Sequence, residues 1–252
     1  MRARRKFGVR RATDPRSAKE PAAPADIPAI ECRLDSVLDR SNLRIAAAHR
    51  HALAGYVALL TQWNRAYNLT AVRDPFAMID RHVLDSLTAL DFVVGTRLLD
   101  AGTGAGLPGL VLAVVRPDVR CTLLDSARKK TRFCAHAAMT LGLDNVEVAS
   151  ERLTAHRPRH RYSTVISRAT FSVAELVAGA RPLLDARGRI IAMKGPRPEA
   201  ELDELDASDR EGLAVHVEPV GTGTGPPDAT LVVFDRAGCA DGVPGREDVT
   251  IR

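Results

Sequence analysis

The sequence predicts an α/β fold, in which a mostly parallel sheet is packed between helices and preceded by a helical segment. From Gly95 onward, short apolar runs alternate with stretches of helical periodicity, which is the pattern of βαβ units. A glycine-rich turn follows the first of these runs, where such a sheet would pass into its first helix. The chain has 252 residues, of which 45% are hydrophobic and 27% charged, a balance that suits one large globular α/β domain or two small ones.

Two amphipathic helices are predicted before the sheet. Apolar residues three or four positions apart predict a helix over Leu43–Trp63, with Ser41 as its N-cap. A second helix is predicted to begin at Asp74 and Pro75, a cap and a first-turn proline, and to continue to Leu90. We expect these helices to pack as a lead-in, residues 31–95, against the sheet that follows.

Seven strands are predicted in residues 96–236. The first five should be parallel, because helical stretches connect them; they are Arg97–Asp100, Arg120–Asp125, Val146–Ala149, Ser163–Ser167 and Arg189–Lys194. The last two are joined by a loop too short for a helical crossover, so they should form an antiparallel hairpin at the end of the sheet; they are Ala214–Val220 and Thr230–Asp235.

Local signals place the connecting helices. One begins at Pro108, and a second covers Ala127–Leu141 and is stopped by Gly142. A third is opened by the capping box Ser172-x-x-Glu175.

The two ends of the chain are predicted to lie outside the folded domain. Residues 1–30 contain mostly Arg, Ala and Pro, with too few large apolar side chains to offset the entropy of ordering, so they should form a disordered basic arm. Eight Lys or Arg and two Asp or Glu give residues 1–24 a net charge of +6, so the remainder of the chain, at −1, is close to neutral and the total is +5. The arm is either a solvated extension or a tether that attracts phosphate, and a transit peptide would share its composition. Residues 237–252 are predicted to be a loose tail, which leaves residues 31–236 as a single domain.

Several classes of protein are excluded by what the sequence lacks. The longest apolar run, Leu107–Val115, is too short for a membrane span and contains Pro108 and Gly109. No apolar region follows the Arg-rich N-terminus, so we expect a cytoplasmic protein. The four cysteines form no CxxC pair, so neither a disulfide framework nor a metal site is predicted.

The glycine loop after the first strand permits two cofactors. Its second half, Gly104-x-Gly106-x-x-Gly109, matches the dinucleotide fingerprint. Its first half, Asp100-x-Gly102-x-Gly104-x-Gly106, matches the loop that binds S-adenosylmethionine in class I methyltransferases. The position of the glycines favours the methyl donor. In a dinucleotide site the first glycine follows the strand directly, whereas Gly104 lies four residues past Asp100.

Two carboxylates accompany the loop. Asp100 at the end of the first strand should attract the ammonium group of a methionine moiety. Asp125 at the end of the second strand should accept the ribose hydroxyls, which would suit a nucleoside in either cofactor.

Together these residues resemble the family of ribosomal RNA small subunit methyltransferase G, also called GidB. The motifs that carry the resemblance are Trp63-Asn64-x-x-Tyr67-Asn68-Leu69-Thr70, Arg73-Asp74-Pro75, Arg81-His82-x-x-Asp85-Ser86, Gly106-Leu107-Pro108-Gly109, Leu123-Leu124-Asp125-Ser126, Ser167-Arg168-Ala169 and Lys194-Gly195. The resemblance implies a Rossmann-like class I fold with a seven-stranded sheet. It also implies transfer of a methyl group from S-adenosylmethionine to N7 of one guanine in the 16S rRNA of the small ribosomal subunit.

The resemblance also implies cofactor contacts at Gly102, Leu107, Leu153, Thr154 and Arg168. Gly104, Gly106 and Asp125 complete the predicted cofactor site. The chain departs from the family where members commonly have Arg-Ala-Glu, because it has Arg152-Leu153-Thr154.

The chemistry requires little of the protein beyond alignment. Guanine N7 carries a lone pair and no proton, so no general base is needed and no catalytic side chain is predicted. His82 is expected to be a structural histidine paired with Asp85. We expect the target base to leave the RNA stack before it reacts, and Phe171 or Tyr67 could then stack on it.

Four cations are candidates to bind RNA. Arg128, Lys129 and Lys130 open a helix where positive charge opposes the helix dipole, so they either bind phosphate or form a solvated face. Lys194 ends the fifth strand, near the expected acceptor pocket.

The expected partner is 16S rRNA or the small ribosomal subunit, and binding to DNA or to a membrane is not expected. The alternatives are an NAD-dependent oxidoreductase and a non-catalytic module that senses S-adenosylmethionine and binds RNA.

Overall fold

The computed structural model describes residues 26–41, 43–221, 228–236 and 250–251. Residues 1–25 of the predicted basic arm and residues 237–249 and 252 of the predicted tail lie outside the described residues. Within the described ranges, no helix combines the length and the apolar character that a membrane crossing requires.

The sheet has the predicted mixed topology, with the strand order β4-β3-β2-β5-β6-β8-β7. Neighbours among the first five are parallel, β8 is antiparallel to β6, and β7 is antiparallel to β8. The strands are β2 Arg97–Ala101, β3 Arg120–Leu124, β4 Val146–Ala149, β5 Tyr162–Arg168, β6 Leu184–Lys194, β7 Leu213–Val220 and β8 Ala229–Arg236. The predicted strands and the terminal hairpin are therefore confirmed, with boundaries that differ by a few residues.

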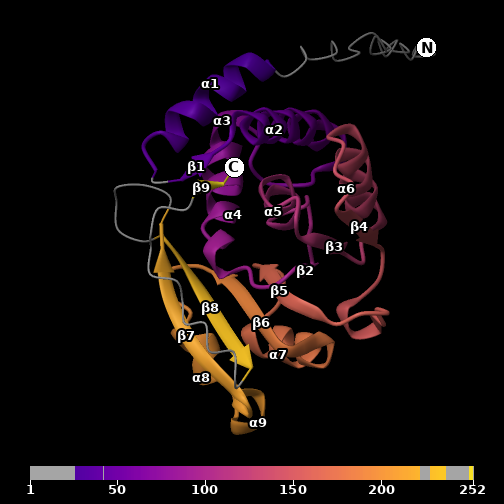
Figure 1. The fold of residues 1–252 in the computed structure, drawn as a ribbon, viewed down its shortest axis with the longest axis vertical. Coiled ribbons are helices and arrows are strands. Elements are labelled where there is room, and N and C mark those ends of the chain that lie inside the picture. Colours follow the sequence, from indigo (N-terminus) through magenta and orange to yellow (C-terminus); the bar gives the residue numbers. More distant parts are fainter. Residues whose placement is uncertain (1–25, 42, 222–227, 237–249, 252) are drawn as a thin grey trace, which may run out of the picture.

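Helices cover both faces of the sheet (Figure 1). The longer ones are α1 Ile27–Leu38, α2 Ala47–Tyr67, α5 Gly109–Val115, α6 Arg128–Thr140 and α7 Val173–Ala180. Leu98 and Leu99 on β2 point to opposite faces, as successive strand residues must. Leu98 belongs to the core shared with α1, α2, α5 and α6, whereas Leu99 belongs to the core shared with α7.

The first predicted helix begins later than expected. Its N-cap is Ala46 rather than Ser41, and α2 starts at Ala47. Ser41 instead donates its hydroxyl to the carbonyl of Leu38 at 2.8 Å, just after the end of α1. Arg44 and Ile45 form the two-residue strand β1, which pairs in parallel with β9, Thr250–Ile251. The prediction of a loose tail is therefore wrong at these two residues.

The structure also places a helix where disorder was predicted. Helix α1 begins at Ile27, so the basic arm ends before residue 30. Asp26 caps it by accepting a hydrogen bond from the amide of Ala29, and a proline lies in its first turn. The predicted disorder of residues 27–30 is therefore wrong.

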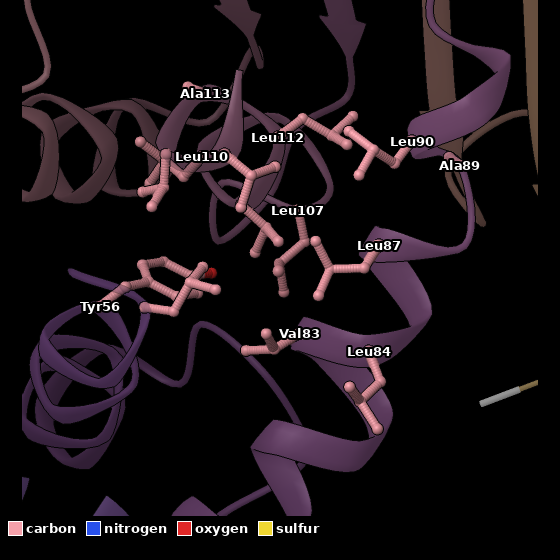
Figure 2. Packing of buried hydrophobic residues seen from close by; sticks show 14 of the residues in the cluster. Tyr56, Val83, Leu84, Leu87, Ala89, Leu90, Leu107, Leu110, Leu112 and Ala113 are labelled. Atoms are coloured by element: carbon pink, nitrogen blue, oxygen red, sulfur yellow. The ribbon is translucent and has the colours of Figure 1, made fainter. Parts of the chain in front are cut away.

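The second predicted helix is a chain of short helical pieces. Asp74 is its N-cap and Pro75 its first residue, as predicted. The pieces are α3 Pro75–Met78, the π-helical η1 Ile79–Leu84, α4 Asp85–Leu87 and the 3-10 turn η2 Leu90–Phe92. Their apolar side chains pack against α2 and α5, so the lead-in shares one core with the sheet (Figure 2).

Short elements complete the connections. The 3-10 turns η3 and η4 cover Leu153–Ala155 and Arg181–Leu183, and the helices α8 and α9 cover Glu199–Asp203 and Ala207–Arg210. The predicted capping box of α7 is present, with Ser172 and Glu175 each bonded to the other's backbone amide.

Candidate functional site

The glycine loop lies at the carboxyl end of β2, where ligands bind in open parallel sheets. Gly102 and Gly104 have φ angles of 69° and 60°, in the left-handed region that favours glycine. A methyl group on Gly102 would lie 2.4 Å from the side chain of Thr170, which belongs to the loop after β5. This loop therefore leaves no space for a side chain at position 102. A methyl group on Gly104 would face open space, with only the Gly102 carbonyl oxygen nearby, at 3.8 Å.

The side chain of Asp100 holds this loop by hydrogen bonds. One oxygen, Oδ2, accepts hydrogen bonds from the Thr103 hydroxyl at 2.5 Å and the Gly109 amide at 2.7 Å. The side chain is fully buried, and burial raises the pKa of its carboxyl group to about 6. The prediction that Asp100 attracts a ligand ammonium group is therefore wrong, since the carboxylate faces the interior and holds the turn.

Asp125 holds the same loop from the neighbouring strand. Its Oδ2 accepts from the Gly104 amide at 3.0 Å, and its Oδ1 accepts from the Ala127 amide at 2.8 Å. The ammonium group of Lys130 lies 3.5 Å from Oδ2. Asp125 thus joins the glycine loop to the start of α6 and leaves its carboxylate at the edge of a cavity.

That cavity, which we call the glycine-loop cavity, has a volume of about 1400 Å³. Four of the predicted cofactor residues line it, namely Gly102, Asp125, Leu153 and Thr154. Leu107 does not, because its side chain points into the core between α4 and α5 (Figure 2). Gly104 and Gly106 support the loop and are likewise absent from the cavity lining.

A second cavity, which we call the sheet-edge cavity, lies at the carboxyl ends of β5 and β6 and has a volume of about 970 Å³. Arg168 lines this cavity and not the glycine-loop cavity. Its guanidinium donates to the Asp85 carboxylate at 3.0 Å and to the Arg81 carbonyl at 3.2 Å. The structure therefore separates Arg168 from the other predicted cofactor residues.

His82 is structural, but its predicted partner is wrong. Asp85 pairs with Arg168, whereas the His82 ring contacts the Thr70 hydroxyl at 2.8 Å and the Arg81 carbonyl at 2.9 Å. Burial, together with the nearby Arg168 charge, lowers the pKa of His82 to about 4. The imidazole is therefore neutral near pH 7.

Thr170 and Phe171 line both cavities, so the loop after β5 forms the boundary between them. The Thr170 hydroxyl donates to the Gly102 carbonyl at 3.0 Å. Ala169, just before it, has a φ of 51°, a conformation that L-residues rarely adopt and that often marks functional loops. The sequence carries no signal for this boundary, because it depends on which strands become neighbours.

Lys194 supports the same boundary. Its ammonium group donates to the Phe171 carbonyl and to the Glu201 carboxylate, both at 2.6 Å. Glu201 in turn accepts from the Val173 amide at 2.9 Å. The predicted RNA-contacting lysine is thus engaged in holding a loop.

The other predicted RNA-binding cations lie at the start of α6. Arg128 and Lys129 are exposed, and the Lys129 ammonium group lies 3.4 Å from the Tyr67 carbonyl oxygen. Lys130 is half-buried against Asp125 and lines the glycine-loop cavity. No cluster of metal-ligating side chains occurs among the residues that the structure describes.

The strand order and the glycine loop at the carboxyl end of β2 define a Rossmann-like fold of the class I methyltransferase type. The chain is similar in fold to the glycopeptide N-methyltransferase MtfA, whose crystal structure is complexed with S-adenosyl-L-methionine. The TM-score is 0.51 at 13% sequence identity, over 62% of this chain and 88% of that one.

Sequence comparison gives the family. Residues 49–220 match the GidB family model, described as rRNA small subunit methyltransferase G. The ribosomal RNA small subunit methyltransferase G of Nitrosococcus oceani is 46% identical over 171 residues, which cover 68% of this chain and 77% of that protein. The protein of the same name from Alkalilimnicola ehrlichii is 47% identical over 177 residues, covering 70% and 80%. The chain belongs to the GidB family of rRNA methyltransferases, which confirms the resemblance found in its motifs.

Proposed function

We propose that this protein transfers the methyl group of S-adenosylmethionine to N7 of one guanine in the 16S rRNA of the small ribosomal subunit. The observation that carries the proposal is the pair of cavities that meet at Thr170 and Phe171. A methyl donor in the glycine-loop cavity and a base in the sheet-edge cavity would face each other across this boundary. Because ribosomal subunits are its substrate, we place the activity in the cytoplasm.

The glycine-loop cavity fits the methyl donor. Gly104, whose amide binds the Asp125 carboxylate at the edge of this cavity, leaves open space beside the loop. We assign the ribose to Asp125, and the adenine to the wall formed by Leu153 and Thr154. S-adenosylmethionine supplies an activated methyl group on its sulfonium when bound. The backbone amides of Gly104 and Ala127 keep the Asp125 carboxylate oriented toward that ligand.

The sheet-edge cavity fits an extruded base. Its lining includes the half-buried ring of Phe171, to which we assign the stacking contact with the guanine. Its polar groups are held in fixed positions by the Arg168–Asp85 ion pair at 3.0 Å and the Lys194–Glu201 pair at 2.6 Å. The target atom therefore meets a rigid, pre-organised wall, which serves alignment.

The residues available agree with a reaction that needs no general base. The imidazole of His82 is neutral and holds contacts to Thr70 and Arg81. Cys134 is fully buried, and burial raises the pKa of its thiol far above the ordinary value, so it is no nucleophile. The chain's contribution is to hold the donor and N7 in line and to exclude water between them.

An NAD-dependent oxidoreductase is the less favoured alternative. In a dinucleotide site the third glycine of the fingerprint packs at the start of the helix and leaves nearby amides for the pyrophosphate. Here the amide of Gly109 is buried and donates to Asp100, so it is not available to a phosphate. The family match also names a methyltransferase and not a dehydrogenase.

The test is transfer of labelled methyl from S-adenosylmethionine to small subunits purified from cells that lack this gene, followed by identification of the modified nucleoside. We expect N7-methylguanosine at a single position of 16S rRNA. Label on another nucleoside would refute the proposed acceptor. Cofactor binding without incorporation into subunits or naked rRNA would favour the non-catalytic alternative.

A further inference from the structure

A strongly basic loop follows β4 and is not explained by cofactor binding. Residues 152–161, which we call the basic loop, connect β4 to β5. They contain four arginines and a histidine with exposed side chains, namely Arg152, Arg157, Arg159, Arg161 and His160. Exposed cations at this density usually either are neutralised by neighbouring carboxylates or meet an anionic partner.

Neighbouring carboxylates do not neutralise this loop. None of the ion pairs found between described residues includes an arginine of the basic loop; the pair that lies at the loop itself joins His156 to Glu151. Within the part of the chain that the structure describes, Arg157 donates only to the main-chain carbonyls of Thr154 and His156, both at 2.9 Å. The guanidinium groups thus remain available to a ligand that lies outside the protein.

The basic loop is pre-organised by a buried histidine. His156 lies inside it, with Nδ1 2.6 Å from the Glu151 carboxylate and Nε2 2.9 Å from the Tyr162 hydroxyl. Its ring also stacks on the Tyr162 ring, with centroids 5.9 Å apart. Glu151 precedes the loop and Tyr162 follows it, so one imidazole ties both of its ends. A loop held in this way loses less conformational entropy when it binds a partner.

Charge differs between the two cavities. The basic loop forms one wall of the glycine-loop cavity, whose lining holds five Lys or Arg and three Asp or Glu. The sheet-edge cavity has three Lys or Arg and four Asp or Glu, and two of its cations are already paired with Asp85 and Glu201. The cavity assigned to the base therefore offers little attraction for a polyanion, and that attraction must come from elsewhere on the surface.

We propose that the basic loop binds backbone phosphates of the rRNA substrate next to the cofactor cavity. This inference rests on the proposed function and adds the surface that docks the RNA. Phosphate contacts position a nucleic acid without reading its sequence, which suits a loop of arginines beside a separate base pocket. Arginine also forms bidentate contacts with phosphate, as lysine does not.

The test neutralises two arginines of the basic loop and compares them with two exposed arginines outside it. In R159Q/R161Q, we expect affinity for small subunits from cells lacking the gene to fall about tenfold at physiological salt. The slope of log affinity against log KCl should flatten by about 1.5, because each lost phosphate contact removes about 0.7 to 0.9. The control R120Q/R187Q removes two exposed arginines near the amino ends of β3 and β6, and it should bind as the wild type does.

Further readouts separate this proposal from the proposed function. R159Q/R161Q should keep the wild-type melting temperature, since neither side chain makes a hydrogen bond among the described residues. R159K/R161K should retain the salt slope, because it retains both charges. An unchanged slope in R159Q/R161Q, or an equal loss in R120Q/R187Q, would overturn the role of the loop. Failure of the wild type to methylate subunits would instead refute the proposed function.

Discussion

Gly104 and Gly142 form a matched pair that isolates the cofactor contact from backbone strain. Their φ angles are 60° and 66°, so alanine would be strained equally at both. The strain costs about 1 kcal/mol or somewhat more, because a Cβ in the left-handed region crowds the backbone. Neither new methyl group would clash, since Gly142 has no atom within 4 Å and Gly104 has only the Gly102 oxygen, at 3.8 Å. We therefore expect G104A and G142A to lose the same free energy of unfolding.

The two variants should differ in cofactor binding. The methyl group of G104A would project into the open space beside the glycine loop, which we assign to the part of S-adenosylmethionine next to Asp125, so the affinity for this cofactor should fall at least about tenfold. G142A should bind as the wild type does. Calorimetry measures the affinity, and the fluorescence of Trp63, the sole tryptophan, reports unfolding from its site beside Tyr67 and Phe133. Wild-type affinity in G104A, with the expected stability loss, would refute the assignment of this loop to the cofactor.

Three further substitutions test the carboxylates and Lys194. D125A should weaken S-adenosylmethionine binding by about 1–3 kcal/mol in calorimetry, since it removes a charged acceptor and leaves two amides unpaired. As the pH rises from 4 to 7, the free energy of unfolding of D100N should rise by about 2 kcal/mol relative to that of the wild type, measured by urea titration. The wild type loses stability in that range because the unfolded chain releases its proton near 3.8 and the folded carboxyl near 6. K194M should lower kcat at least about tenfold and leave KM for S-adenosylmethionine unchanged, because it frees the Phe171 carbonyl and Glu201 from their shared donor.

Each of these experiments has an outcome that contradicts its reasoning. Unchanged affinity in D125A would remove Asp125 from the cofactor site. A pH-independent difference between D100N and the wild type would mean that burial does not shift this carboxyl group. A K194M variant with normal kcat and a raised KM for RNA would restore Lys194 to the direct RNA contact that the sequence predicts.

The strands and most helices could be predicted from sequence because their signals are local. Short apolar runs separated by helical stretches predict the parallel sheet, and Asp74 and Ser172 are caps that act within three residues. Helix α1 carries a similar signal, with buried Ile30, Leu34 and Val37 at helical spacing. The Arg, Ala and Pro composition of the preceding residues obscures it.

The candidate site could be predicted only in part. The glycine loop and Asp125 are visible in sequence because each follows a strand directly. The partner of Asp85 is not, because Arg168 lies 83 residues away and the nearby His82 is the more obvious choice. The same applies to Lys194, whose bond to the Phe171 carbonyl depends on β5 and β6 being neighbours.

The strand order explains how the glycine loop is held in place. Three groups hold it, namely Asp100 at the end of β2, Asp125 after β3 and Thr170 after β5. Since β3 and β5 flank β2 on its two sides, the loop is anchored from three adjacent strands at their carboxyl ends. Thr170 also borders the sheet-edge cavity, so the bond that fixes the cofactor side of the site fixes the base side as well. Under the proposed function, the sheet would therefore set the distance between donor and acceptor, as a reaction that depends on alignment requires.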